Sequence, residues 1–135
     1  VLLTHTNLLA YSGWHIAYYG LGPEDRVPHM AGISFDASMA EIWPTLCSGG
    51  CVLPAPDDEV RLMPEALCRW YAEAGATVAF LTTQLAEAVL LEPAYPAQMK
   101  LRTLFTGGDK LHFGPPAHAP FKLVNIYGPT ECTVN

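Results

Sequence analysis

Positive charge is scarce in this sequence, and long apolar runs are absent. The 135 residues include 7 Lys and Arg against 13 Asp and Glu, which gives a net charge of −6. No two basic residues are adjacent, so the chain offers no basic surface to a nucleic-acid backbone. No apolar run reaches the length of about 18 residues that suggests a membrane-spanning helix. We therefore expect neither a nucleic acid nor a membrane as a partner.

Cysteine is also sparse and lacks the spacing of a metal site. The four cysteines form no C-x-x-C pair, and the five histidines show no metal-ligand spacing. The sequence carries no signal-peptide pattern that would mark an oxidising compartment. These features favour free thiols in a cytoplasmic protein over a disulfide or zinc scaffold.

The overall amino-acid composition is typical of a folded domain. Half of the residues are hydrophobic and 15% are charged, which argues against a disordered chain. The length is enough for one domain with its own core. The chain starts at Val1 and stops directly after a motif, so we expect a segment of a longer protein.

Apolar spacing and helix-breaking residues predict helices that alternate with short strands. Helices are expected at 6–19, 38–47, 63–74 and 83–91. Strands are expected at 26–33, 51–54, 77–81, 101–105 and 121–126. Loops are expected at 56–60 and 112–120. Ser38 and Glu41 fit a capping box at the start of the second helix.

The strands are short, apolar and non-alternating. This pattern predicts an α/β fold with a doubly wound, mostly parallel sheet and helices on both faces. In such sheets ligands bind beyond the carboxyl ends of the strands, which is where we expect the site.

Three short motifs fall near the expected strand ends. Residues 127–131 read Tyr-Gly-Pro-Thr-Glu, residues 35–38 read Phe-Asp-Ala-Ser, and residues 106–109 read Thr-Gly-Gly-Asp. In the first motif a sharp turn is followed by a hydroxyl and a carboxylate, which suits phosphate and a divalent metal. Each motif alone also fits a plain structural role: a surface turn, a helix cap and a tight turn, respectively.

In this order, the three motifs resemble those of the adenylation domains of nonribosomal peptide synthetases, which belong to the adenylate-forming superfamily. The resemblance implies that 1–135 forms a single flavodoxin-like subdomain of such a domain. The phosphate loop would lie upstream, and the C-terminal subdomain with the catalytic Lys would lie downstream. The segment alone is therefore expected to be inactive.

The resemblance also implies an activity and its partners. The parent enzyme is expected to activate an amino acid with ATP and Mg²⁺, giving aminoacyl-AMP. The aminoacyl group would then pass to the phosphopantetheine thiol of a carrier protein domain. The rest of the adenylation domain is the other expected partner, and the need for a small activating protein is left open.

Roles are implied for individual residues as well. Thr130 is expected to contact the α-phosphate and Glu131 to hold Mg²⁺, and these two are the catalytic candidates. Asp36 is expected to pair with the α-ammonium group of the amino acid. Members of the superfamily that use aryl acids, hydroxy acids or fatty acids usually lack this Asp, so its presence favours an amino acid with a free α-amine. The nucleotide-binding candidates are Gly107, Gly108, Asp109, Asn125, Tyr127, Gly128 and Thr130.

The substrate pocket can be placed in the same way. Its candidate residues are Asp36, Ala37, Ala40, Phe80, Phe105, Gly107, Ile126, Val134 and Asn135. Most are small or apolar, so we expect a neutral, hydrophobic amino acid side chain. The pattern is similar to that of leucine-activating domains, although Ala40 stands where those often carry a bulky aromatic residue. Leucine is the first choice, and phenylalanine or another bulky apolar amino acid is the second.

Other interpretations stay open at this point. The apolar pocket candidates also fit plain core packing. An acyl-CoA ligase-type adenylate-forming enzyme would share the nucleotide motifs, although Asp36 argues against it. An excised or engineered non-catalytic specificity module would fit a segment that has neither the phosphate loop nor the catalytic Lys.

Overall fold

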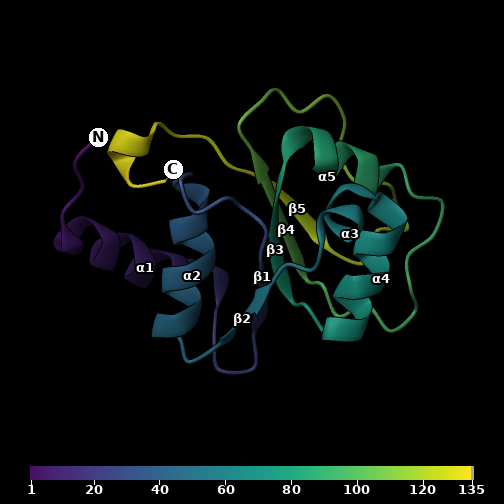
Figure 1. The fold of residues 1–135 in the computed structure, drawn as a ribbon, viewed down its shortest axis with the longest axis horizontal. Helices are drawn as coiled ribbons and strands as arrows, with labels where there is room; N and C mark the ends of the chain where they lie inside the picture. Colours follow the sequence, from purple (N-terminus) through teal and green to yellow (C-terminus); the bar gives the residue numbers. More distant parts are fainter. Residues whose placement is uncertain (135) are drawn as a thin grey trace.

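Helices lie on either side of a central layer of strands in the computed structural model (Figure 1). The structure describes residues 1–134, without the side chains of residues 58 and 59. The helices are α1 (His5–Tyr19), α2 (Ala37–Cys47), α3 (Asp58–Leu62), α4 (Pro64–Ala74) and α5 (Thr83–Leu90), followed by a short 3-10 turn, η1 (Thr130–Cys132). The strands are β1 (Arg26–His29), β2 (Cys51–Pro54), β3 (Val78–Thr82), β4 (Thr103–Gly107) and β5 (Lys122–Asn125).

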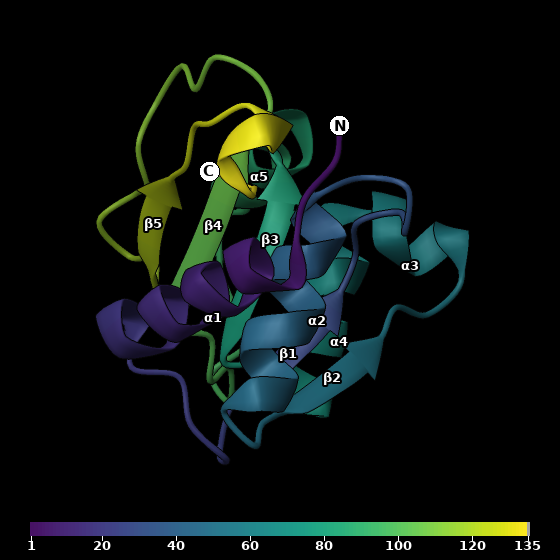
Figure 2. The ribbon, with the colours of Figure 1, turned by 90° about the vertical axis from the view of Figure 1, so that its left-hand side faces the viewer.

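The strands form two parallel sheets that meet edge to edge. One sheet pairs β1 with β2, and the other has the order β3-β4-β5. The amide of Thr77, just before β3, donates to the carbonyl of Arg26 in β1 at 2.9 Å. The spatial order is therefore β2-β1-β3-β4-β5, which can be followed in Figure 2. This confirms the predicted doubly wound, parallel α/β arrangement.

The two faces of the sheet carry cores of different size. The face covered by α4 and α5 holds the larger one, in which Leu67 and Val89 pack with Leu81 and Leu104. The face covered by α1 and α2 holds a smaller cluster that includes Phe105. Successive residues of a strand point to opposite faces, so the pocket candidates in β3 and β4 share the α1 and α2 face. Within residues 1–134, no helix has both the length and the apolar character needed to cross a membrane.

Several predicted boundaries are wrong by a few residues. The first strand ends at His29, and not near residue 33, because the next two backbone amides bond to a side chain instead of a strand. The loop expected at 56–60 contains the start of α3, which Asp57 caps by accepting from the amide of Val60 at 3.1 Å. The fourth strand begins at Thr103, two residues later than expected.

The predicted capping box is also wrong. Ser38 lies inside the first turn of α2, and its hydroxyl donates to the carbonyl of Phe35 at 2.6 Å. The Glu41 carboxylate turns away from the helix start and accepts from the amides of Met30 and Ala31 at 3.0 and 3.1 Å. These two amides follow His29, where the pairing of β1 with β2 ends, and the buried Glu41 carboxylate supplies their acceptor instead.

Candidate functional site

A cleft of about 1130 Å³ lies at the carboxyl ends of the central strands. Thr82, Gly107 and Asn125, the last residues of β3, β4 and β5, all line it. The predicted site residues that line it are Asp36, Ala37, Phe80, Gly107, Gly108, Asp109, Asn125, Ile126, Tyr127, Gly128 and Val134. Small-molecule sites commonly occupy about 300–1000 Å³, so the cleft has room for more than one small substrate.

Asp36 and Thr130 bring two of the motifs into direct contact. The Thr130 hydroxyl donates to the Asp36 carboxylate at 2.5 Å, although 94 residues separate them in sequence. Asp36 immediately precedes α2, and Thr130 is the first residue of η1. A short hydrogen bond to a carboxylate is among the stronger contacts in a protein. The fold therefore places a hydroxyl and a carboxylate from two different motifs side by side.

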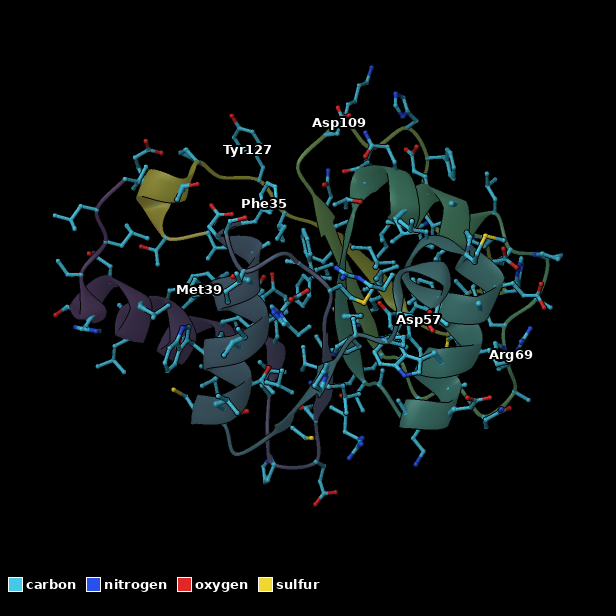
Figure 3. The ribbon with its side chains drawn as sticks, viewed as in Figure 1. Phe35, Met39, Asp57, Arg69, Asp109 and Tyr127 are labelled. Carbon is cyan, nitrogen blue, oxygen red and sulfur yellow. The ribbon has the colours of Figure 1, made fainter. Side chains whose placement is uncertain are left out.

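The motif at 127–131 begins where the chain leaves the edge of the sheet. The amide of Ile126 donates to the carbonyl of Thr106 at 2.8 Å, which keeps the chain beside β4 until the motif begins. Tyr127 is then 94% exposed. Figure 3 shows its ring pointing away from the sheet, along the edge that also carries Phe35 and Asp109. An exposed aromatic ring at the rim of a cleft is suited to stacking on a flat base.

Glu131 is the carboxylate that the motif presents to solvent. Among the residues that the structure describes, no group of three or more His, Cys, Asp or Glu is arranged to hold a metal ion. Mg²⁺ does not need such a cage, because one or two carboxylates and the phosphates of a substrate usually hold it. Glu131 is a carboxylate of the kind that could serve as that single protein ligand, although neither it nor Thr130 is among the residues that line the cleft.

Gly107 and Gly108 line the cleft, and their positions require glycine. A Cβ at Gly107 would lie 2.7 Å from the carbonyl oxygen of Ile126, so no larger residue fits between β4 and the chain beyond β5. Gly108 has a φ of 95°, which L side chains rarely adopt. The loop is then held by Asp109, whose carboxylate accepts from the Gln84 amide at 3.1 Å. The backbone here can approach a ligand closely.

A second cavity, of about 20 Å³, adjoins the cleft on the face covered by α1 and α2. Phe80 and Ile126 line both spaces. The predicted pocket residues around the small cavity are Ala40, Phe80, Phe105 and Ile126. The substrate-pocket candidates are thus divided between the cleft and this cavity, with Val134 on the cleft side. Asn135 lies outside the described residues.

Two further residues of this cavity were missed by sequence reasoning. Tyr11 and His15, both from α1, line it, and the Tyr11 hydroxyl lies 3.2 Å from Nδ1 of His15. Burial lowers the pKa of His15 to about 4, so its ring is neutral at neutral pH. Burial also raises the pKa of the Tyr11 hydroxyl, with smaller contributions from Tyr19 and Asp36. Their spacing of four places them on one helix face, and that was the available signal.

Glu41 is another residue whose role the sequence did not reveal. It is 2% exposed, and beside its two amide donors it lies 2.8 Å from Nδ1 of His29. Burial raises the pKa of the Glu41 carboxyl, and the hydrogen bonds from His29, Met30 and Ala31 offset part of that rise. The side chain fixes the start of the connection from β1 to α2, which ends at Asp36.

Known proteins share both the sequence and the fold of this chain. A family model described as AMP-binding enzyme matches residues 1–135. One of the linear gramicidin synthase proteins of Brevibacillus parabrevis is 49% identical over 134 residues, which cover 99% of this chain and 2% of that protein.

Solved structures share the fold as well, and two of them show the extent of the similarity. One is a nonribosomal peptide synthetase, FmoA3 (S1046A), in an AMPPNP-bound form, with a TM-score of 0.87 and 21% identity over 99% of this chain and 15% of that one. The other is the Vibrio cholerae adenylation domain AlmE in complex with glycyl-adenosine-5'-phosphate, with a TM-score of 0.77 and 25% identity over 97% of this chain and 25% of that one.

Proposed function

Because this chain belongs to the family of AMP-binding enzymes, we propose that it is the substrate-selecting segment of an adenylation domain for nonribosomal peptide synthesis. The match over all 135 residues confirms the family resemblance first drawn from the three motifs. The chain spans 2% of the gramicidin synthase relative, so the activity of the whole protein is part of the proposal. That activity is the activation of an amino acid with ATP, giving aminoacyl-AMP and pyrophosphate.

The contact between Asp36 and Thr130 carries this proposal. In the reaction, the carboxylate of the amino acid attacks the α-phosphorus of ATP, and pyrophosphate leaves. Asp36 would hold the ammonium group and Thr130 an oxygen of the α-phosphate. The two side chains are in contact. One bound amino acid could therefore place its ammonium group on the Asp36 carboxylate and its own carboxylate next to the α-phosphorus held by Thr130. Reactions of this class depend mainly on such positioning and on charge stabilisation.

The remaining cleft residues would bind the nucleotide. Tyr127 would stack on the adenine, and Asn125 would lie at its edge. The backbone of Gly107, Gly108, Asp109 and Gly128 would line the nucleotide. Glu131 would hold Mg²⁺, which when bound offsets charge on the phosphates. The exposure of Tyr127 and of the Glu131 carboxylate supports these roles.

We propose a hydrophobic amino acid as the substrate, with leucine first and phenylalanine or another bulky apolar amino acid second. The apolar lining of the small cavity by Phe80, Phe105 and Ile126 supports this class. The activated aminoacyl group would pass to the phosphopantetheine thiol of a carrier protein domain.

Amino-acid-dependent ATP–pyrophosphate exchange tests the proposal. The complete adenylation domain that contains residues 1–135 would be assayed with all common amino acids in parallel. We expect exchange with leucine or another bulky apolar amino acid. Exchange with a charged amino acid would overturn the assignment of the pocket.

Two controls belong to the same assay. Exchange with des-amino acids would favour an acyl-CoA ligase-type enzyme, and no exchange with any acid would overturn the proposed function. We expect residues 1–135 alone to be inactive, because the phosphate loop and the catalytic Lys of the resembled family are not part of this segment.

A further inference from the structure

The small cavity next to Ala40 is much tighter than the sequence suggests. An alanine at position 40 should leave space where leucine-activating relatives often carry a bulky aromatic side chain. The cavity nevertheless measures only about 20 Å³, which is roughly the room that one water molecule needs. Another part of the fold must therefore occupy the space beside Ala40.

Side chains from α1 occupy this space. Tyr11 and His15 line the same cavity as Ala40, and they are only 6% and 7% exposed. The His15 ring lies 5.3 Å from the ring of Phe105, centroid to centroid, on the opposite wall. Tyr19 packs against both rings, at 4.8 Å from His15 and 4.6 Å from Phe105. The His15 ring is thus fixed between α1 and the sheet.

We propose that His15 is a specificity-determining residue, which closes the substrate pocket where position 40 leaves it open. This inference rests on the proposed function and adds to it a residue from outside the nine pocket positions. The ring of His15 fills space beside Ala40 and so limits how far a substrate side chain can reach from the cleft past Phe80 and Ile126. Tyr11 holds the ring in place through its hydrogen bond to Nδ1.

The ionisation of His15 suits this role. Burial keeps the ring neutral at neutral pH, so it places no charge against an apolar substrate. His15 therefore acts through its volume, and a ring of similar size should replace it.

The test compares amino acids of different size in the complete adenylation domain. The kcat/KM values for leucine and tryptophan in pyrophosphate exchange would be measured for the unchanged domain and for His15→Ala. We expect the variant to shift the ratio toward tryptophan by about tenfold or more, since size differences in apolar pockets give about 10–200-fold discrimination. His15→Phe should keep the original ratio.

Trp14→Ala is the matched control. Trp14 lies on the same helix, is 44% exposed, and its ring contacts those of Tyr11 and His15 without lining the cavity. Its removal takes a ring from the same helix without opening the cavity, and we expect the ratio to stay as it was.

A second pair of variants tests the same point from the other wall. Ala40→Phe should lower kcat/KM for leucine, because the ring of His15 leaves no room for the new phenylalanine ring. Adding His15→Ala to this variant should restore kcat/KM for leucine. An unchanged ratio in His15→Ala, or leucine use unaffected by Ala40→Phe, would overturn this inference alone. An unchanged domain that exchanges with no amino acid would overturn the proposed function, and this inference with it.

Discussion

At the scale of single residues, the proposed binding of a substrate ammonium group to Asp36 would require the carboxylate to change its hydrogen-bond partner. The carboxylate accepts a hydrogen bond from the neutral hydroxyl of Thr130. An ammonium group would offer a charged donor, which is worth roughly 1.5–3 kcal/mol against about 1 kcal/mol for a neutral one. The change of partner would therefore favour binding of the amino acid. It would also free the hydroxyl of Thr130 for a phosphate oxygen.

Substitution of Asp36 tests this exchange directly. Asp36→Ala in the complete domain should abolish amino-acid-dependent exchange, with a loss of about a hundredfold or more, since a charged hydrogen bond at the upper end of its range is removed. Asp36→Asn is the matched control for shape, because it keeps the size of the side chain and loses the charge. It should lose nearly as much activity. Full activity in either variant would rule out the ammonium contact.

Glu131 can be tested through its dependence on Mg²⁺. Glu131→Gln keeps the shape of the side chain and removes the charge that would hold the ion. We expect the rate of pyrophosphate exchange to fall by about a hundredfold at low Mg²⁺, as for loss of one charge-stabilising group. A series of Mg²⁺ concentrations should show partial recovery. A rate that equals that of the unchanged domain at every concentration would remove the metal role.

His15 should make stability depend on pH in the acidic range. Its pKa is lowered to about 4 in the folded state, below the ordinary value of 6.5. The unfolded chain then binds more protons between these two values, so stability is full above about pH 6.5 and is lost as the pH falls toward 4. The slope is about 1.4 kcal/mol per pH unit at most. Thermal unfolding of the complete domain from pH 4 to 7 should show this loss, and His15→Phe should lack it. Parallel curves for the two proteins would contradict the assignment.

At the scale of secondary-structure elements, a tertiary contact of Glu41 replaces the local cap expected at the start of α2. Ser38 and Glu41 have the spacing of a capping box, yet the fold uses Glu41 to bind the backbone after β1. The local pattern fails because the Glu41 carboxylate is turned toward the amides of Met30 and Ala31, where the pairing of β1 with β2 has ended. The helix was nevertheless predicted within one residue of its bounds, Ala37–Cys47, although the cap used to place its start is not formed.

Gly107 at the end of β4 gives a prediction at this scale. Gly107→Ala should destabilise the complete domain by roughly 1–3 kcal/mol, because the new Cβ would lie 2.7 Å from the backbone oxygen of Ile126, which cannot move easily. Gly13→Ala is the matched control. Gly13 lies within α1 with no atom within 4 Å of its virtual Cβ, so alanine should stabilise by about 0.5–1 kcal/mol. Thermal or chemical denaturation measures both, and equal effects of the two substitutions would contradict this account.

At the scale of the whole molecule, the sequence predicts what depends on chain order and strand pattern. The parallel α/β layer and the meeting of the three motifs follow from strands that end at one edge. The contents of the small cavity could not be predicted, because Tyr11 and His15 meet Phe105 only when α1 packs on β4. This contact depends on where α1 lies on the sheet and how it is rotated about its axis. Local sequence patterns do not determine either.

The junction of the two sheets gives the last prediction. Asp25, just before β1, accepts from Arg102 at 3.1 Å and from the Thr77 hydroxyl at 2.6 Å, and Arg102 also donates to the carbonyls of Tyr19 and Gly20 at the end of α1. These bonds tie α1 and both sheets together. Burial acts to raise the pKa of Asp25, but the hydrogen bonds from Arg102, Thr77 and Gly22 outweigh it and hold the pKa below its ordinary value.

Asp25→Asn should therefore destabilise the complete domain by about 1–3 kcal/mol, the usual cost of losing charged hydrogen bonds. Because the pKa of Asp25 is lowered by folding, this contribution is present above the ordinary pKa of the carboxyl and is lost as the pH falls below it. The free energies of unfolding of the two proteins should thus differ at pH 7 and converge in acid. A difference that persists at the lowest pH at which both proteins fold would show that the asparagine acts through packing, and the charge would then have no part in joining the sheets.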